Sequence, residues 1–139
     1  MSVIDSFSGA HRFLSNFAPA AVQLDGVMYP TVEHAFQAAK TFDFAARTNI
    51  QRCATAADAK RAGRRVVLRS DWEQVKIRIM EDLLRQKFAS PGMRDLLNAT
   101  RGRDLVEGNT WGDRFWGVCG GIGENHLGRL LMHIRDVAP

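Results

Sequence analysis

Cysteine is scarce in this chain, which holds only Cys53 and Cys119 among its 139 residues. Two cysteines cannot form the disulfide framework of a small secreted domain, and neither has neighbours at the Cys/His spacing of a zinc site. We therefore expect no structural metal, and a buried apolar role for both thiols. This composition favours a reduced, cytoplasmic protein.

Long apolar runs are missing as well. No stretch approaches the roughly 18 residues that a membrane-spanning helix needs, and residues 1–6 lack the basic-then-apolar order of a signal peptide. The sequence thus predicts no membrane partner. Its 45% hydrophobic and 24% charged residues are ordinary for a globular protein, and the length suits a single domain over residues 1–139.

Lysine is rare beside arginine. The chain holds 15 Arg against 4 Lys, and its net charge is +4. Because the planar guanidinium can bind phosphate or carboxylate through two hydrogen bonds, this choice favours an anionic partner such as a nucleotide, a sugar phosphate or a nucleic acid. A solvated basic surface is the alternative, because the excess is small and only residues 60–65 concentrate it.

Turn and helix signals predict an α+β fold in which helix predominates. Asp25-Gly26 predicts a tight β-hairpin over residues 21–29, near the N-terminus. Thr31 and Thr55 are placed to cap helices, and Ser70 to Glu73 has the pattern of a capping box before a longer helix. A helix from Pro91, a strand over 105–107 and a C-terminal helix from about Leu127 complete the expected set.

The first candidate functional group is a polar stripe on the helix after Thr31. Glu33, Gln37 and Lys40 fall within roughly 60° of one another at helical spacing. Glu33 lies in the first turn, where the helix dipole favours the anionic form, so a stable carboxylate there can face a developing positive charge. A solvated helix face is the alternative interpretation of this stripe.

The second candidate is the segment 108–128, which carries seven of the twelve glycines and two of the three tryptophans. A loop of this length is usually functional or disordered, and its aromatic content argues against disorder. Here Asp113 lies between Trp111 and Trp116, which can stack on a flat base, while glycine lets backbone approach a ligand. The alternative is that both tryptophans are core and that Asp113 pairs with Arg114 on the surface.

Common cofactor motifs are missing. The histidines show no metal-ligand spacing, and the chain has no nucleophile elbow, P-loop or dinucleotide fingerprint. We therefore expect neither a metal nor a cofactor.

Segments along nearly the whole chain, in order, closely resemble the motifs of the YbiA-like N-glycosidases, also called the NADAR family. The segments that carry the resemblance are 13–17 (FLSNF), 29–40 (YPTVEHAFQAAK), 59–64, 71–73, 105–107, 111–113, 115–117 and 125–128. The resemblance implies a single, mainly helical α+β domain that hydrolyses an N-glycosidic bond.

The family resemblance implies two classes of substrate. Known members cleave ribosylaminopyrimidine intermediates of riboflavin synthesis, and others release ADP-ribose from guanine bases of nucleic acid. A non-catalytic module that binds ADP-ribose or a nucleotide is the alternative, disfavoured because both candidate carboxylates are present. An RNA-binding domain is a weaker alternative, since the chain lacks the stacked-aromatic strand motif of RNA-recognition domains.

The resemblance also implies roles for single residues. Glu33, Trp72 and Asp113 match positions implicated in activity, and Lys40 matches one that contacts or covalently traps the ribose C1. Cleavage of a C1–N bond builds oxocarbenium character, for which paired carboxylates are usual; Glu33 suits the anionic role, and Asp113, near Glu33 in one pocket, suits proton transfer. The expected substrate contacts are Asn16, Phe17, Gln37, Arg64, Trp72, Trp111, Trp116, Asn125 and Arg129. His126 departs from the family pattern, which often has a basic residue there that could contact phosphate.

Overall fold

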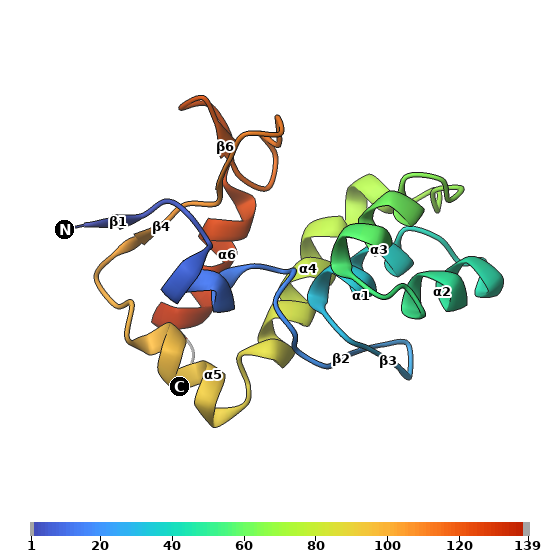
Figure 1. Cartoon of the computed structure of the whole chain (residues 1–139), viewed down its shortest axis with the longest axis horizontal. Helices are drawn as coiled ribbons and strands as arrows, with labels where there is room; N and C mark the ends of the chain where they lie inside the picture. The colour runs from blue at the N-terminus through green and yellow to red at the C-terminus, as the bar shows by residue number, and fades with distance from the viewer. Residues whose placement is uncertain (1, 138–139) are drawn as a thin grey trace. The chain divides into compact units, whose positions relative to one another are not determined.

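The computed structural model describes residues 2–137, and its helices and strands belong to two units of the chain (Figure 1). One unit is residues 16–87, and the other combines the first fifteen residues with the chain from Phe88 onward. The described residues form the mainly helical α+β structure that the sequence predicts. The prediction of one domain over 1–139 stays a prediction, and its end residues 1, 138 and 139 lie outside the described residues.

The unit 16–87 is built around one short helix. Its elements are β2 (Val22–Leu24), β3 (Val27–Tyr29), α1 (Val32–Ala39), α2 (Phe44–Gln51), α3 (Ala56–Gly63) and α4 (Trp72–Lys87). Helix α1 packs against the other three helices and against the hairpin, as Figure 1 shows. All eight residues of α1 are buried as a result. The alternative of a solvated face on this helix is therefore wrong, because neighbours surround α1 on every side.

The hairpin and two caps confirm the local predictions. Asp25 (φ 50°) and Gly26 (φ 84°) both take the left-handed conformation that a two-residue turn needs, and Val22 pairs with Tyr29. The Thr31 hydroxyl accepts from the His34 N–H at 3.0 Å, and Thr55 caps α3 in the same way through Asp58.

The predicted capping box at Ser70 is wrong by one residue. Helix α4 begins at Trp72, and the carbonyl of Asp71 accepts the first helical hydrogen bonds, from Gln74 and Val75. The Asp71 carboxylate binds the Arg69 guanidinium through two hydrogen bonds of 2.6 and 3.1 Å. This pair fixes the chain before the helix and moves the helix start past Ser70.

The other unit contains β1 (Val3–Ile4), a 3₁₀ helix (Gly9–Leu14), α5 (Pro91–Asn98), β4 (Asp104–Leu105), β5 (Gly108–Asn109), β6 (Val118–Cys119) and α6 (His126–Val137). Strand β1 pairs with β4 in parallel, and β5 pairs with β6. The strand predicted over 105–107 is thus shorter and begins one residue earlier. The helices predicted from Pro91 and near Leu127 are confirmed.

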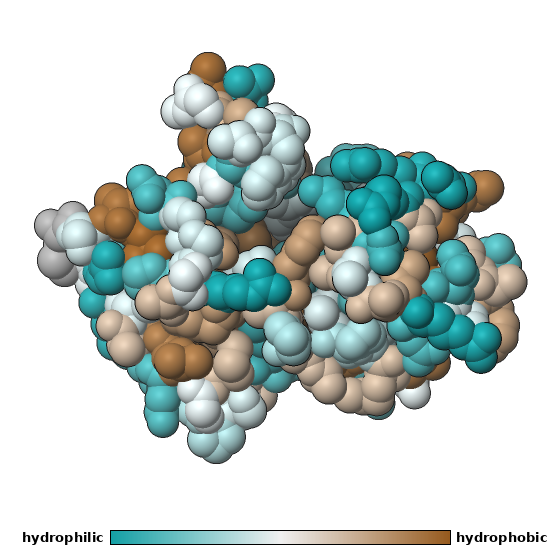
Figure 2. Space-filling view, in the orientation of Figure 1, coloured by the Kyte–Doolittle hydropathy of each residue, from teal (hydrophilic) through white to brown (hydrophobic). Residues whose placement is uncertain are grey.

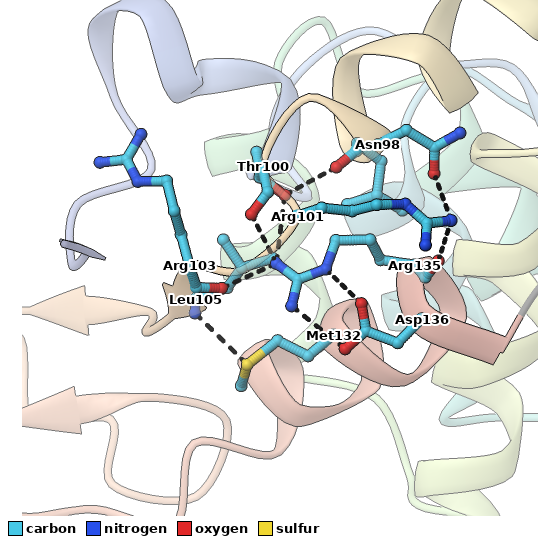
Figure 3. A network of polar contacts seen from close by, with 9 residues as sticks. Asn98, Thr100, Arg101, Arg103, Leu105, Met132, Arg135 and Asp136 are labelled. Carbon is cyan, nitrogen blue, oxygen red and sulfur yellow. Dashed lines mark hydrogen bonds and ion pairs between the residues drawn. The ribbon is translucent and has the colours of Figure 1, made fainter. Parts of the chain in front are cut away.

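A buried arginine fastens α6 to the segment after α5 (Figure 3). Arg135 is only 4% exposed, and its Nη1 donates to the carbonyls of Thr100 (3.0 Å) and Arg103 (2.7 Å). Its Nε pairs with Asp136 at 2.7 Å. Helix α6 also supplies the Met132 sulfur, which lies 3.5 Å from the Leu105 N–H. These contacts fix the end of the helix whose first turn adjoins the glycine-rich segment.

Candidate active site

The residues expected at the site are divided between the two units. The unit 16–87 holds Asn16, Phe17, Glu33, Gln37, Lys40, Arg64 and Trp72, and the other holds Trp111, Asp113, Trp116, Asn125 and Arg129. The structure thus brings together a Glu33 group and, separately, an Asp113 group. That Glu33 and Asp113 face one pocket stays a prediction.

Glu33 is held from both its backbone and its side chain. Its N–H donates to the Asn16 carbonyl at 3.1 Å, which ties the start of α1 to the segment before the hairpin. Its Oε2 accepts a 2.5 Å hydrogen bond from Nε2 of Gln37, one turn further along the helix. With 8% of its surface exposed, Glu33 is a buried carboxyl with a fixed orientation.

Burial controls the acidity of Glu33. Loss of hydration raises its pKa above the ordinary value of 4.5, while the Gln37 hydrogen bond and the charges of Lys60, Lys40 and His34 lower it. Burial therefore outweighs the helix dipole, which favours the anionic form at this first-turn position. The anionic role expected of Glu33 stays a prediction. A carboxyl with a raised pKa keeps its proton to a higher pH than an exposed glutamate does, which suits a group that takes up and releases protons.

Lys40 follows α1 and is shifted in the opposite direction. Burial lowers its pKa below the ordinary 10.5, the positive charges of Lys60, Arg64 and Lys76 lower it further, and Glu33 raises it. The Arg69 N–H donates to the Lys40 carbonyl at 2.7 Å and fixes the backbone. The pKa of Glu33 is raised and the pKa of Lys40 is lowered, so the two values differ by less than those of an exposed carboxylic acid and an exposed amine. This arrangement increases the fraction of Lys40 that is neutral and nucleophilic.

Positive charge gathers beside Lys40. Arg61, Arg64 and Arg65 are exposed at the end of α3, and Figure 2 shows hydrophilic surface around the end of this helix. Arg61 is paired with Asp58. This surface can attract the phosphate of an anionic substrate.

Three expected contacts in this unit differ in accessibility. Trp72 is 6% exposed and packs on Phe36 with ring centroids 5.0 Å apart, so its ring belongs to the core beside α1. Asn16 is buried, its Nδ2 lies 3.5 Å from the Met80 sulfur, and its Oδ1 is a buried acceptor without a hydrogen-bond partner among residues 2–137. Phe17 is half-buried.

His34 is a site residue that the sequence analysis passed over. Its Nε2 lies 3.0 Å from the Cys53 carbonyl, which can only accept, so Nε2 carries the proton. Its Nδ1 then accepts from the Thr31 hydroxyl at 2.7 Å. The ring, 2% exposed, therefore locks the first turn of α1 beside Glu33. The available signal was the Thr31-to-His34 spacing, a cap residue and its partner.

Asp113 is held by a clamp. The Asn109 side chain makes two hydrogen bonds to the backbone of Asp113. It accepts from the Asp113 N–H at 3.0 Å and donates to the Asp113 carbonyl at 2.9 Å. The Asp113 Oδ1 accepts from the N–H groups of Phe115 (3.1 Å) and Trp116 (2.9 Å). The Arg114 Nε donates to the Cys119 carbonyl at 3.3 Å instead of pairing with the Asp113 carboxylate. The carboxylate is thus oriented by the backbone that follows it.

The aromatic residues around Asp113 have two environments. Trp111 is 62% exposed, so the alternative that it belongs to the core is wrong. Trp116 contacts Phe115 edge to face at 4.9 Å, and Phe115 lies 4.4 Å from the His126 ring. A flat ligand can reach Trp111 from solvent.

The remaining two expected contacts lie near the start of α6. Both ends of the Asn125 side chain bind backbone, to the Leu105 carbonyl and the Glu107 N–H at 3.0 Å each. Arg129 is exposed one turn later. Asn125 therefore joins the glycine-rich segment to β4, and Arg129 is free to reach a ligand.

Among residues 2–137, no three His, Cys, Asp or Glu side chains gather as metal ligands would. Within the same residues, no helix has the length and apolar character needed to cross a bilayer.

Comparisons with known proteins agree on one family. The model of the NADAR domain matches residues 5–137. The chain is similar to the N-glycosidase YbiA of Escherichia coli (strain K12), with 44% identity covering 97% of this chain and 88% of that protein. An N-glycosidase of Nostoc punctiforme is 38% identical over 88% of this chain and 82% of its own length. A riboflavin biosynthesis protein of Vibrio vulnificus is 37% identical over 91% of this chain, which spans 35% of that larger protein. The solution structure of E. coli YbiA superposes with a TM-score of 0.84 at 40% identity, covering 98% of this chain and 85% of that one.

Proposed function

The chain belongs to the NADAR domain family, and from that premise we propose that it is an N-glycosidase that hydrolyses the C1–N bond of a ribosylated base or amine. The observation that carries the proposal is that the buried Glu33 has the half-buried Lys40 as a charged neighbour, each acting on the pKa of the other. Burial raises the pKa of Glu33 and lowers the pKa of Lys40, so the two pKa values lie closer together than those of an exposed glutamate and an exposed lysine. Such paired shifts are typical of catalytic groups.

In the direct route, water attacks C1 while the C1–N bond breaks. Glu33 in its ionised form stabilises the positive charge that develops on the ribose and accepts the proton of the attacking water. The leaving nitrogen takes up a proton, for which Asp113 is the second candidate carboxyl. The product is a free ribosyl hydroxyl and a protonated base.

In the covalent route, the neutral amine of Lys40 bonds to C1 as the bond to the base breaks. The base leaves with the proton that the new C1–N bond releases, and opening of the sugar ring gives an imine. Water then hydrolyses the imine and returns the free amine. The lowered pKa of Lys40 supports this route, because only the neutral amine is a nucleophile.

We assign the remaining contacts by their chemistry. Arg64 and Arg129 are exposed and suit phosphate, and Trp111 offers an exposed ring for the base. Asn16 and Phe17 in one unit, and Trp116 and Asn125 in the other, are the further proposed substrate contacts. The substrate is a phosphorylated nucleotide-like molecule, either a ribosylaminopyrimidine phosphate or an ADP-ribosylated guanine. Cys53 and Cys119 are both free thiols, which suits the cytoplasm.

The test offers the purified protein both substrates and follows release of the free base by chromatography. We expect turnover of at least one, and a loss of 10²-fold or more in Glu33→Gln, roughly the contribution of an acid–base group. Asp82→Asn, a carboxyl on the neighbouring helix α4, is the matched control. Binding of ADP-ribose without release of either base would instead support the non-catalytic module.

A further inference from the structure

Gly63 is the last residue of α3 and lies against Gln37 of α1. A Cβ built on Gly63 would stand 2.7 Å from Cδ and 2.9 Å from Cβ of Gln37, and closer still to its Oε1. Real Cβ atoms do not come this near to other heavy atoms. Any side chain at position 63 would therefore push Gln37 away from α3.

Gln37 has different surroundings at its two amide ends. Its Nε2 donates to Glu33 at 2.5 Å, while its Oε1 is buried and has no hydrogen-bond partner among residues 2–137. Because an ionised carboxylate can only accept, the amide must present nitrogen to Glu33 and oxygen to α3. Only 4% of Gln37 is exposed, so packing fixes the whole side chain. An unpaired buried oxygen is costly, so this orientation is one that the surrounding packing enforces.

We propose that Gly63 and Gln37 are positioning residues for Glu33: the bare Cα of Gly63 leaves the space in which Gln37 lies, and Gln37 holds the Glu33 carboxylate in its working orientation. The inference rests on the proposed catalytic role of Glu33. It changes the role of Gln37 from an expected substrate contact to a residue that acts through Glu33. It also assigns a function to Gly63, which no motif marks as a site residue.

The proposal has a consequence for acidity. The charged and titratable groups that act on Glu33 are His34 from α1, Lys40 directly after that helix, and Lys60 from α3. If these three groups are unchanged, loss of the Gln37 side-chain N–H removes one interaction that favours the ionised form of Glu33. The pKa of Glu33 then rises further, and the acidic limb of the pH–rate profile moves to higher pH.

Two variants test the arrangement, and Gly92→Ala is their matched control. Gly92 lies in a helix of the same length and has nothing within 4 Å of its would-be Cβ. We expect Gly63→Ala to lower kcat at neutral pH by tenfold or more, with KM little changed, and Gly92→Ala to leave both at wild-type values. Gln37→Met keeps the side-chain length but removes the N–H, and it should lower kcat and shift the acidic limb in the same direction.

The second readout does not depend on activity. Carboxyl-carbon NMR of the folded protein titrates Glu33 directly, and in Gln37→Met its midpoint should move to higher pH. A wild-type midpoint and a wild-type pH–rate profile in Gln37→Met would overturn the inference, whether or not Gly63→Ala folds. Full activity in Glu33→Gln would overturn the proposed function instead, while the Glu33 titration in Gln37→Met would still decide whether Gln37 holds that carboxylate.

Discussion

Gln37 donates a 2.5 Å hydrogen bond to the carboxylate of Glu33, one turn earlier on a helix that is buried along its entire length. Ionisable residues are rarely buried to this degree unless they are paired. A carboxyl in such a place lowers the stability of the fold whenever it is charged. We therefore expect the buried Glu33 carboxyl to lower the free energy of unfolding while it serves function. This cost can be measured.

Replacing the buried carboxyl should stabilise the protein at high pH but not at low pH. Since burial raises the pKa of Glu33 above 4.5, the folded protein keeps this proton over a range in which the unfolded chain has lost it. The stability contribution of the group is complete below about pH 4.5 and is lost as the pH rises through the folded pKa. Glu33→Gln has no such loss, so its Tm should exceed that of the wild type at pH 8 by more than at pH 4.

Thermal unfolding followed by circular dichroism at several pH values checks this. Asp82→Asn serves again as the control, because this carboxyl lies on α4 outside the site and its substitution should give no comparable pH-dependent gain. A difference in Tm that stays constant from pH 4 to pH 8 would mean that Glu33 titrates alike in the folded and unfolded chains.

The end of α6 depends on a single buried guanidinium. Arg135→Ala leaves the carbonyls of Thr100 and Arg103 without their donor and opens a cavity beside them. A buried acceptor left without its donor costs about 1–3 kcal/mol, and we expect a loss of at least that order in urea unfolding. Arg129→Ala removes an exposed arginine from the same helix and should change stability by less than about 0.5 kcal/mol. Equal losses in the two variants would contradict this account.

The local structure was predictable where one residue decides it. Asp25-Gly26 has the backbone freedom that a tight turn needs, and the caps Thr31 and Thr55 act through their own side chains. Ser70 failed as a cap because the ion pair between Asp71 and Arg69 decides where α4 begins. Arg69 is itself held by a tertiary contact, from its N–H to the Lys40 carbonyl, and such a contact leaves no mark in a local pattern.

The site was predictable as a set of residues but not as an environment. Helical spacing places Glu33, Gln37 and Lys40 together, yet it cannot show that neighbouring helices bury the stripe on all sides. The pattern therefore indicates only the effect of the helix dipole, whereas burial raises the pKa of Glu33. The roles of His34 and Gly63 depend on contacts with residues of other elements, Cys53 and Gln37. Only the folded chain brings these together.

Asn109 should matter to catalysis through Asp113. Its side chain binds both the N–H and the carbonyl of Asp113, at 3.0 and 2.9 Å, so Asn109→Ala frees the peptide that carries the carboxylate. We expect kcat to fall by about tenfold, since small misplacements of catalytic groups have large effects on rate. Thr110→Ala, at the exposed neighbouring position, should retain wild-type kcat. Wild-type kinetics in a folded Asn109→Ala would show that the clamp has no part in the reaction.

Lys40 separates the direct route from the covalent one. Burial and the charges of Lys60, Arg64 and Lys76 lower its pKa, so the neutral amine is present at a lower pH than for an exposed lysine. If that amine attacks C1, borohydride added during turnover should reduce the imine and leave a ribosyl adduct on Lys40, which mass spectrometry of the digested protein identifies. The fraction trapped should rise with pH as the amine loses its proton.

Lys40→Arg keeps the charge but has no nucleophilic amine, so it should bind substrate and lose turnover. Activity retained in Lys40→Arg without any adduct would leave Lys40 only a role in binding charge. Unchanged substrate affinity and turnover in Lys40→Ala would exclude both roles, and Glu33 would then have to act on water without help from Lys40.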